Sequence, residues 1–516
     1  MRLAELVAAL SLGVDLGFGQ PMEHVLRQCL IALRLSERIG LDDEERSAVY
    51  YTALLVNVGC HSDAHEQAKW FGDDIAMKAA KYDHPPGSLS GLASGVRMIG
   101  RGNPALHRFR VGLEFVVMGA REVNGMIARH AQMARSLAAE IGLPAPVQDG
   151  VGASYEQWDG KGWPGRLQGD AIPVAARLAL MSEYVEVAHR AGGVSAAVAL
   201  TGKRSGSQFD PGIVALFADR ADHVLGGLEA AQTWDAVIAA EPSLRVSLPE
   251  DRLEDALLGV ASFVDLKSPY TLGHARAVSE LVAAAAVVRG LPADDVTALR
   301  RAGLVQGFGR LGVSNAILDK AGSLGAGEWE RVRLLPYLTQ RMLRQSNWLA
   351  PLGAIVVQHR ERLDGSGYPN GLSGAAISES ARLLGAADAY QAMREDRPYR
   401  PALSPDSAAG ELRAEAAAGR LDAEAVDAVL VAAGHAVPRR RQRPAGLTER
   451  EVDVLRLLAL GLSSKEIAGR LVISPKTARN HVEHIYTKTG ATSRVAASHF
   501  ALKHGLVPAQ EYVAPS

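Results

Sequence analysis

The same turn occurs twice in the chain, and the regions upstream of the two turns also match. WDGKGWP at residues 158–164 aligns with LDGSGYP at residues 363–369, at an offset of 205 residues. TALLVNVGC at residues 52–60 aligns with GLVQGFGR at residues 303–310, at an offset of 250. Self-similarity of this kind is the signature of a repeated architecture. A chain with this pattern is therefore expected to fold as two related copies of one unit.

The larger upstream offset also pairs His24 with His274 and shows that the first copy is the longer one. We place the copies at residues 1–240 and 250–435, with an insertion of about 45 residues near positions 61–129 of the first copy. At 516 residues the chain is too long for one hydrophobic core, so a third domain is expected after the second copy.

Composition favours an all-α fold. Alanine and leucine recur at helical spacing, and aromatic residues make up only 5% of the chain. We expect two helical bundles followed by a four-helix C-terminal domain. The two cysteines, Cys29 and Cys60, exclude a disulfide framework and favour a cytoplasmic protein. No apolar run reaches 18 residues, so no membrane partner is expected.

Charge is distributed unevenly along the chain. The formal net charge is −1, yet residues 439–508 carry 13 Lys or Arg against five acidic residues, whereas residues 1–438 sum to −8. A basic segment attached to an acidic body is typical of a nucleic-acid-binding module.

Local signals divide this basic segment into helices. Thr448 precedes Glu451 by three residues and Ser463 precedes Glu466 by three, which predicts two capping boxes. Ser474 followed by Pro475 predicts a third helix start. Apolar residues at helical spacing then turn one polar face of the third helix outward, as in a helix-turn-helix protein. The alternative is a small helical bundle with a solvated charged face.

The segment resembles the LuxR/NarL-type DNA-binding domain through LTEREVDVLRLLALGLSSKEIAGRL, VISPKTARNHVEHIYTKTGA and SRVAASHFALKHGL. The resemblance implies a linker at 436–446, a domain at 447–509, a recognition helix at 475–488 in the major groove of double-stranded DNA, and a dimerising helix at 493–504. It makes Lys476, Arg479, Asn480 and Glu483 candidates for base contacts, and Lys465, Thr477 and Lys488 candidates for phosphate contacts. A homodimer is the expected state.

The body resembles the HD-GYP branch of the HD phosphohydrolases, in tandem. The second copy carries TLGHARAV, ILDKAGSLGAGEWERV, ERLDGSGYPNGLSG, ARLLGAADAYQAM and RPYRPAL. The resemblance implies a helical bundle in which His and Asp side chains hold metal ions that activate water for hydrolysis of cyclic di-GMP. The family's ligands are a first His, a His-Asp dyad, a further His, a His pair before the turn and a later Asp.

Most of that ligand set is absent here. The second copy keeps His274, His359 and Asp388, but Gln306 and Gly307 replace the dyad, Leu335 replaces the further His and Arg360 replaces the second His of the pair. The first copy keeps two histidines of the set but has Val56 and Asn57 at the dyad, Ser154 and Tyr155 at the pair and Glu183 at the later Asp. Aliphatic side chains offer a metal no lone pair, and a guanidinium repels a divalent cation. We therefore expect no catalysis, no metal and no cofactor.

A second histidine-rich segment, HSDAHE at residues 61–66, places His61, Asp63 and His65 at spacings of two and four. We interpret it as the polar start of a helix, because it lacks the glutamate that a zinc-hydrolase helix carries between its histidines.

The sequence therefore predicts a LuxR-type transcription regulator with a degenerate HD-GYP-like body. Two alternatives are an active cyclic-dinucleotide phosphodiesterase fused to a DNA-binding domain, and a body that serves only as a protein-interaction scaffold. If the body senses a small anionic or nucleotide ligand, we expect the pocket to contain His274, His359, Arg360 and Asp388, because an arginine fork matches phosphate geometry.

Overall fold

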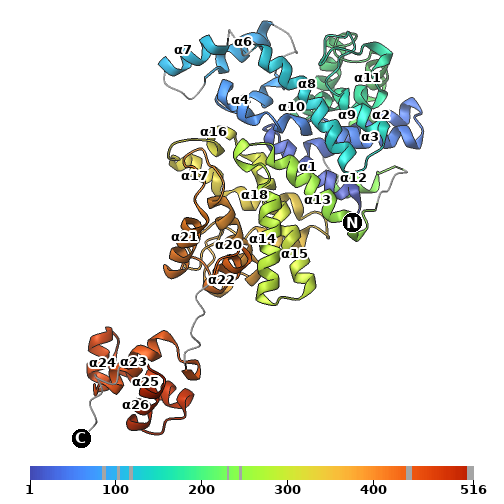
Figure 1. The fold of residues 1–516 in the computed structure, drawn as a ribbon. Coiled ribbons are helices and arrows are strands. Elements are labelled where there is room, and N and C mark those ends of the chain that lie inside the picture. Colours follow the sequence, from blue (N-terminus) through green and yellow to red (C-terminus); the bar gives the residue numbers. More distant parts are fainter. Residues whose placement is uncertain are drawn as a thin grey trace. The chain divides into compact units, whose positions relative to one another are not determined.

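A computed structural model of the chain describes residues 1–83, 89–100, 105–115, 120–228, 232–242, 247–436 and 444–507. The chain divides into two compact units, unit 1 at Met1–His435 and unit 2 at Ala436–Ser516 (Figure 1). Every secondary-structure element of the described residues is a helix, which confirms the predicted all-α class.

Unit 1 contains two successive sets of helices. The first set is α1 (Leu3–Gly17), α2 (His24–Ile39), α3 (Asp43–Leu55), η1 (Val58–His61), α4 (Ala64–Phe71), α5 (Asp74–Ala79), η2 (Ala80–Tyr82), α6 (Leu89–Met98), α7 (Ala105–Glu114), α8 (Ala120–Glu140), α9 (Ala145–Gly152), η4 (Gly169–Ala171), α10 (Val174–Lys203), α11 (Pro211–Leu225) and α12 (Thr233–Ala239). The second set is α13 (Glu250–Asp265), η5 (Pro269–Thr271), α14 (His274–Arg289), α15 (Ala293–Val305), η6 (Phe308–Gly312), α16 (Asn315–Leu318), α17 (Ala326–Arg333), α18 (Leu335–Leu343), α19 (Ala350–Val356), η7 (Gly374–Ala376), α20 (Glu379–Met393), α21 (Pro405–Ala417) and α22 (Ala423–Ala432).

Helices of the first set recur in the second at the spacings that the sequence alignment gives. Helices α2 and α14 start and end 250 residues apart, as do α3 and α15. The same hydrogen bond also recurs: Asp15 accepts from the Val25 backbone N–H at 3.0 Å, and Asp265 accepts from that of Ala275 at 2.8 Å. Each bond ties a helix that ends near the aspartate to the first turn of the next.

The two sets share one core. Helix α1 is almost wholly buried and packs against η6 and α18 of the second set as well as against α2 and α3. A buried ion cluster joins the sets at another point. Asp74 contacts Lys78 at 3.1 Å and Lys267 at 3.2 Å, and it accepts a hydrogen bond from Ser314 at 2.7 Å.

The segment Pro269–Arg289, which includes α14, is long and apolar enough to cross a membrane by length and composition. Half of its most apolar stretch is buried inside unit 1, where α14 packs against α15, α20 and α22. Burial against helices is what a core helix requires.

Unit 2 contains η8 (Pro444–Gly446), α23 (Glu449–Ala459), α24 (Ser464–Leu471), α25 (Pro475–Thr489) and α26 (Arg494–Lys503). Both predicted capping boxes form, at Thr448 and at Ser463, and Ser474 caps α25 by accepting from the Thr477 N–H. Ile467, Ala468, Ala478 and Ile485 are buried in one core, as their spacing predicts. The basic run 439–443 of the predicted linker lies outside the described residues.

Candidate ligand pocket and nucleic-acid interface

The four residues predicted to form an anion pocket in the second set do come together. His274 begins α14 and contacts Asp388 of α20 at 3.1 Å and Glu395 at 2.8 Å, so both of its ring nitrogens face carboxylates. Arg360 contacts the other Asp388 oxygen at 2.8 Å and donates through Nε to His359 Nε2 at 3.1 Å. Asp388 thus lies at the centre of a connected polar cluster.

The charges of this cluster determine the protonation of its members. Burial, with the Arg360 guanidinium beside it, lowers the pKa of His359 to about 4. Burial alone would raise the pKa of Asp388, but Arg360 and the two histidines hold it well below its usual range. At neutral pH the pocket therefore holds an ionised carboxylate, a guanidinium and a neutral His359.

A second guanidinium, which the sequence reasoning missed, lies where the family resemblance places the His-Asp dyad. Arg310 lies against Gly307, where an added Cβ would be 3.1 Å from its Nη1, and it pairs with Asp265 at 3.3 Å. Burial lowers the pKa of Arg310. The only sequence signal was one charged residue, an arginine, within the mostly apolar run GLVQGFGRLGV.

These contacts test whether the pocket suits the metal ions that the resemblance implies. Asp388 already pairs with the Arg360 guanidinium, and the side chain of Arg310 fills the space beside Gly307. Across the described residues, no group of three or more His, Cys, Asp or Glu side chains is arranged to hold a metal ion. The residues present do not fit a two-metal centre, because cationic side chains stand beside the remaining donors.

The equivalent region of the first set also contains a cation. Lys81, from the inserted residues, contacts Glu183 at 2.5 Å and donates to Asn57 at 3.0 Å. Tyr82 adds a hydrogen bond to the same Glu183 oxygen at 2.7 Å. Burial would lower the pKa of Lys81, but Glu183 raises it above the usual value, so the ammonium is retained. Nothing in the sequence of the insertion indicated this position.

The structure separates the members of HSDAHE. His61 is fully buried at the end of η1, whereas Asp63 precedes α4 and contacts His130 at 2.9 Å. His65 lies in α4 and contacts Asp319 at 2.8 Å. The segment is the start of a helix, as interpreted from the sequence, and Asp63 and His65 contact different partners.

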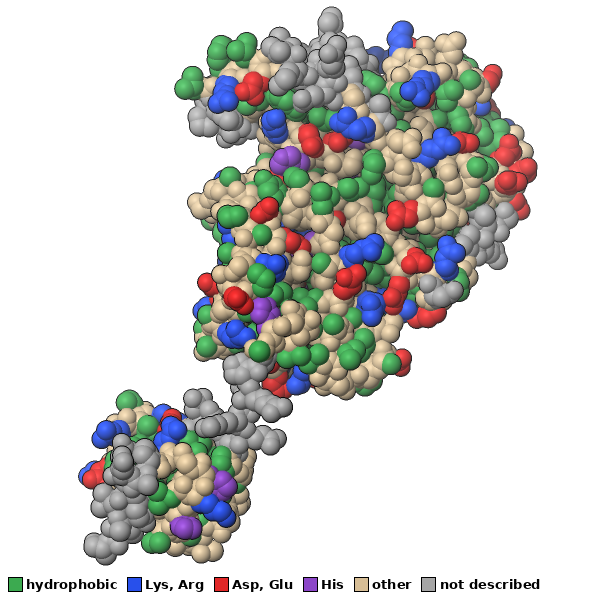
Figure 2. Space-filling view, viewed as in Figure 1, with side chains coloured by type: hydrophobic (Ala, Val, Ile, Leu, Met, Phe, Trp, Pro, Cys, Tyr) green, Lys and Arg blue, Asp and Glu red, His purple; other side chains and the backbone are tan. Residues whose placement is uncertain are grey.

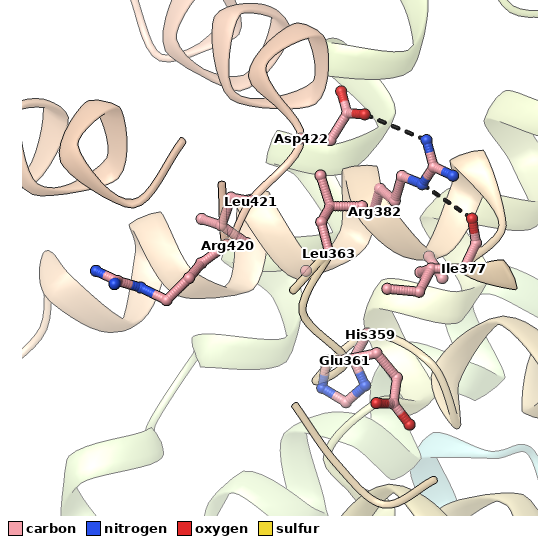
Figure 3. A pocket seen from close by; sticks show the side chains of 10 residues that line it. His359, Glu361, Leu363, Ile377, Arg382, Arg420, Leu421 and Asp422 are labelled. Atoms are coloured by element: carbon pink, nitrogen blue, oxygen red, sulfur yellow. Dashed lines mark hydrogen bonds and ion pairs between the residues drawn. The ribbon is translucent and has the colours of Figure 1, made fainter. Parts of the chain in front are cut away.

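Of the two cavities near the second cluster, one is small and the other is lined by arginines and acidic residues that pair with each other. The cavity beside His359 and Glu361 has a volume of about 10 Å³, room for about one water molecule, and Arg420 points away from it (Figure 3). A larger hollow of about 250 Å³ is lined by Arg289, Arg382 and three acidic residues. Its two arginines pair with those three acids at 2.9 to 3.3 Å, so it offers no unpaired arginine to an anionic ligand.

In unit 2 the predicted recognition face is exposed. Helix α25 turns its apolar side to the core, and the predicted contact residues of α24 and α25 are all solvent-accessible, namely Lys465, Lys476, Thr477, Arg479, Asn480, Glu483 and Lys488. Lys488 differs from the others, because its ammonium contacts Glu451 at 2.7 Å. Glu451 in turn caps α23, so Lys488 has a partner within the domain.

Unit 1 presents a different surface. On the face that Figure 2 shows, its Lys and Arg side chains are interspersed with Asp and Glu. That mixture suits a soluble surface rather than an extended phosphate-binding track.

In comparison with known proteins, unit 1 and unit 2 match different families. Residues 120–213 and 260–425 match the HD domain family, and residues 445–501 match the luxR family of bacterial regulatory proteins. The 3'3'-cGAMP-specific phosphodiesterase 3 of Vibrio cholerae is 30% identical over 410 residues, which cover 79% of this chain and 89% of that protein. An HTH-type transcriptional regulator of Mycobacterium bovis is 46% identical over 69 residues, 13% of this chain and 8% of that protein.

A similar solved structure also comes from a V. cholerae cyclic GMP-AMP phosphodiesterase, the class of the first of these relatives. The crystal structure of a cyclic GMP-AMP specific phosphodiesterase of V. cholerae superposes with a TM-score of 0.59 at 27% identity and covers 85% of this chain and 99% of that one. The chain therefore belongs to the HD domain family, and carries a luxR-family DNA-binding domain at its C-terminal end.

Proposed function

We propose that the protein is a transcription regulator that binds duplex DNA as a homodimer through α25, and that its body consists of two degenerate HD-GYP-like copies that regulate rather than hydrolyse. The exposed face of α25 supports the DNA-binding part most directly. Lys476, Arg479, Asn480 and Glu483 are solvent-accessible along a helix whose opposite side holds the core. Such side chains supply the donors and acceptors that read base edges in the major groove.

Base and phosphate contacts should respond differently to mutation. Asn480→Ala is expected to cost about 1 to 3 kcal/mol of binding free energy and to relax preference at one position of the site. Lys465→Ala should weaken binding to all sequences alike and reduce the salt slope by about one unit. Site selection with the full-length protein, followed by titration at several salt concentrations, measures both effects.

Lys203→Ala is the matched control, because Lys203 is an exposed lysine at the end of α10 in unit 1, outside the DNA-binding domain. It should leave both affinity and salt slope unchanged. Selection that yields no preferred sequence would refute the DNA-binding proposal.

The regulatory reading of the body is supported by the cation that each copy carries. Lys81 stands beside Asn57 and Glu183 in the first copy, and Arg360 stands beside Asp388 in the second. A positively charged side chain at these points opposes the binding of a divalent cation. Because several relatives are named as phosphodiesterases, hydrolysis of a cyclic dinucleotide is the alternative function of the body.

For the second copy we propose binding of an anionic ligand of the cyclic-dinucleotide class without turnover. The ligand would meet Arg360 from its exposed side, because the cavity beside His359 has room for about one water molecule. The Arg360 side chain remains 28% exposed, so solvent and a ligand phosphate can reach it. A phosphate there competes with Asp388 for the guanidinium, and Arg310 adds positive charge nearby. The ligand must therefore exchange one charge-assisted contact for another.

Calorimetry and product analysis on the same samples test this proposal. With Mn²⁺ or Mg²⁺ present, 3'3'-cGAMP or cyclic di-GMP should bind and stay intact, and Arg360→Ala should weaken binding by about tenfold or more. Arg276→Ala, an exposed arginine of the same set, is the matched control. Turnover that disappears in His359→Ala would establish the phosphodiesterase instead, and equal affinity in wild type and Arg360→Ala would refute the anion site.

A further inference from the structure

The two cysteines of the chain lie in opposite surroundings. Cys29, in α2, is completely buried, and its thiol faces only the Tyr50 carbonyl at 3.6 Å. Burial raises the pKa of Cys29, so its thiol stays protonated. Cys60, in η1, keeps 7% of its surface exposed, and its sulfur lies 2.9 Å from the Tyr155 hydroxyl. Only Cys60 has both a polar neighbour and some contact with solvent.

Polar groups from several elements converge on Cys60. His130 of α8 is nearly fully buried, and within the described part of the chain neither of its ring nitrogens has a hydrogen-bond partner. Its Nε2 lies 2.9 Å from Asp63, and its ring makes an edge contact with Tyr155. Lys81 of η2 contributes a second positive charge, which Glu183 of α10 partly balances. The result is a thiol, imidazole and carboxylate cluster beside the half-buried ammonium of Lys81.

This arrangement favours charge separation between sulfur and imidazole. Burial would raise the pKa of Cys60, but His130, Lys81 and the Tyr155 hydroxyl together lower it below the usual thiol value. Burial would lower the pKa of His130, but Cys60 and Asp63 raise it to about 9. A thiolate is the reactive form of cysteine towards oxidants, and positive neighbours are what produce it.

We propose that Cys60 is a site of reversible oxidation by hydrogen peroxide, which converts it to a sulfenic acid. The sulfur attacks one peroxide oxygen, so an S–O bond forms as the O–O bond breaks. Sulfur loses two electrons, the peroxide gains them, and the departing hydroxide takes a proton from the His130 imidazolium to leave as water. Peroxide is small enough to use the limited exposure of Cys60, and the Tyr155 hydroxyl can donate to the new oxygen. The proposal is independent of DNA binding.

The test uses the reduced full-length protein, hydrogen peroxide and dimedone, a reagent that traps sulfenic acids, followed by peptide mapping. Cys60 should acquire the dimedone adduct, and Cys29 should remain unlabelled as the internal control. Labelling at neither cysteine, or at both equally, would overturn the proposal. Pretreatment with peroxide followed by dithiothreitol should return Cys60 to a free thiol, and a permanent adduct would contradict reversibility.

A second measurement separates a thiolate from an ordinary thiol without any mutation. When the pH is lowered from about 8 to about 6, alkylation of Cys60 by iodoacetamide should slow less than alkylation of an ordinary thiol, which slows roughly 80-fold. His130→Gln should slow peroxide labelling of Cys60 by about tenfold or more. Tyr155→Phe, which keeps the ring, is the variant to use if His130→Gln does not fold, with a smaller slowing expected. Rates unchanged in the folded variant would refute the role of the cluster.

Discussion

Replacing Asp74 by alanine is expected to lower the free energy of unfolding of the body by about 3 to 5 kcal/mol. Its carboxylate is fully buried between Lys78 and Lys267, whose side chains are also nearly inaccessible. Burial would raise the pKa of Asp74, but the two lysines lower it below the usual value. Without the carboxylate, two buried ammonium groups lose the ion-pair partner that they share. Urea unfolding followed by tryptophan fluorescence measures the loss.

Two further proteins make this measurement decisive. Asp219→Ala removes an exposed carboxylate that pairs with Arg220 at 2.9 Å, and should cost no more than about 1 kcal/mol. The triple change Asp74→Leu, Lys78→Met and Lys267→Met removes every charge of the cluster and should recover much of the stability, because a buried ion pair costs desolvation. If Asp74→Ala is no more harmful than Asp219→Ala, the cluster does not hold the two helix sets together.

Acidification should destabilise the wild type more than a His359→Gln variant. Burial and Arg360 lower the pKa of His359 to about 4, whereas an unfolded histidine titrates near 6.5. Between these values the unfolded chain takes up a proton that the folded chain does not, so stability falls as the pH falls. The excess loss in the wild type from about pH 7 to pH 4 should be about 3 kcal/mol.

The comparison with His359→Gln is needed because other groups titrate in the same window. Burial raises the pKa of Asp15 to about 7, which acts in the opposite direction, but it does so equally in both proteins. Parallel stability curves for wild type and variant, from unfolding at a series of pH values, would show that His359 is not buried as a neutral imidazole.

The features that the sequence predicted well depend on local chemistry. Thr448, Ser463 and Ser474 cap their helices because a side-chain oxygen needs only the next turn to find its partner. The matching bounds of α2 and α14 follow from two stretches with equivalent helix signals. The meeting of His274, His359, Arg360 and Asp388 was predicted through the family resemblance, which carries the tertiary arrangement with it.

Other features could not be predicted from the spacing of residues along the sequence. Lys81 reaches Glu183 only through the path of an insertion that has no counterpart in the second copy. Arg310 faces the pocket because Gly307 leaves room for its side chain. The periodicity of the sequence does not predict this packing. Lys488 was expected to be free for phosphate, yet the fold of unit 2 brings it to Glu451. In each case the partner is distant along the chain, or the contact depends on the space that the surrounding packing leaves.

The central position of α1 has a consequence for synthesis in the cell. This helix leaves the ribosome well before η6 and α18, although its buried side packs on both of them. Until those residues emerge, the apolar surface of α1 has only part of its final cover. A ribosome that stalls after the first helix set would thus expose the apolar surface of α1 on the nascent chain. The need for chaperones would be greatest at that stage of translation.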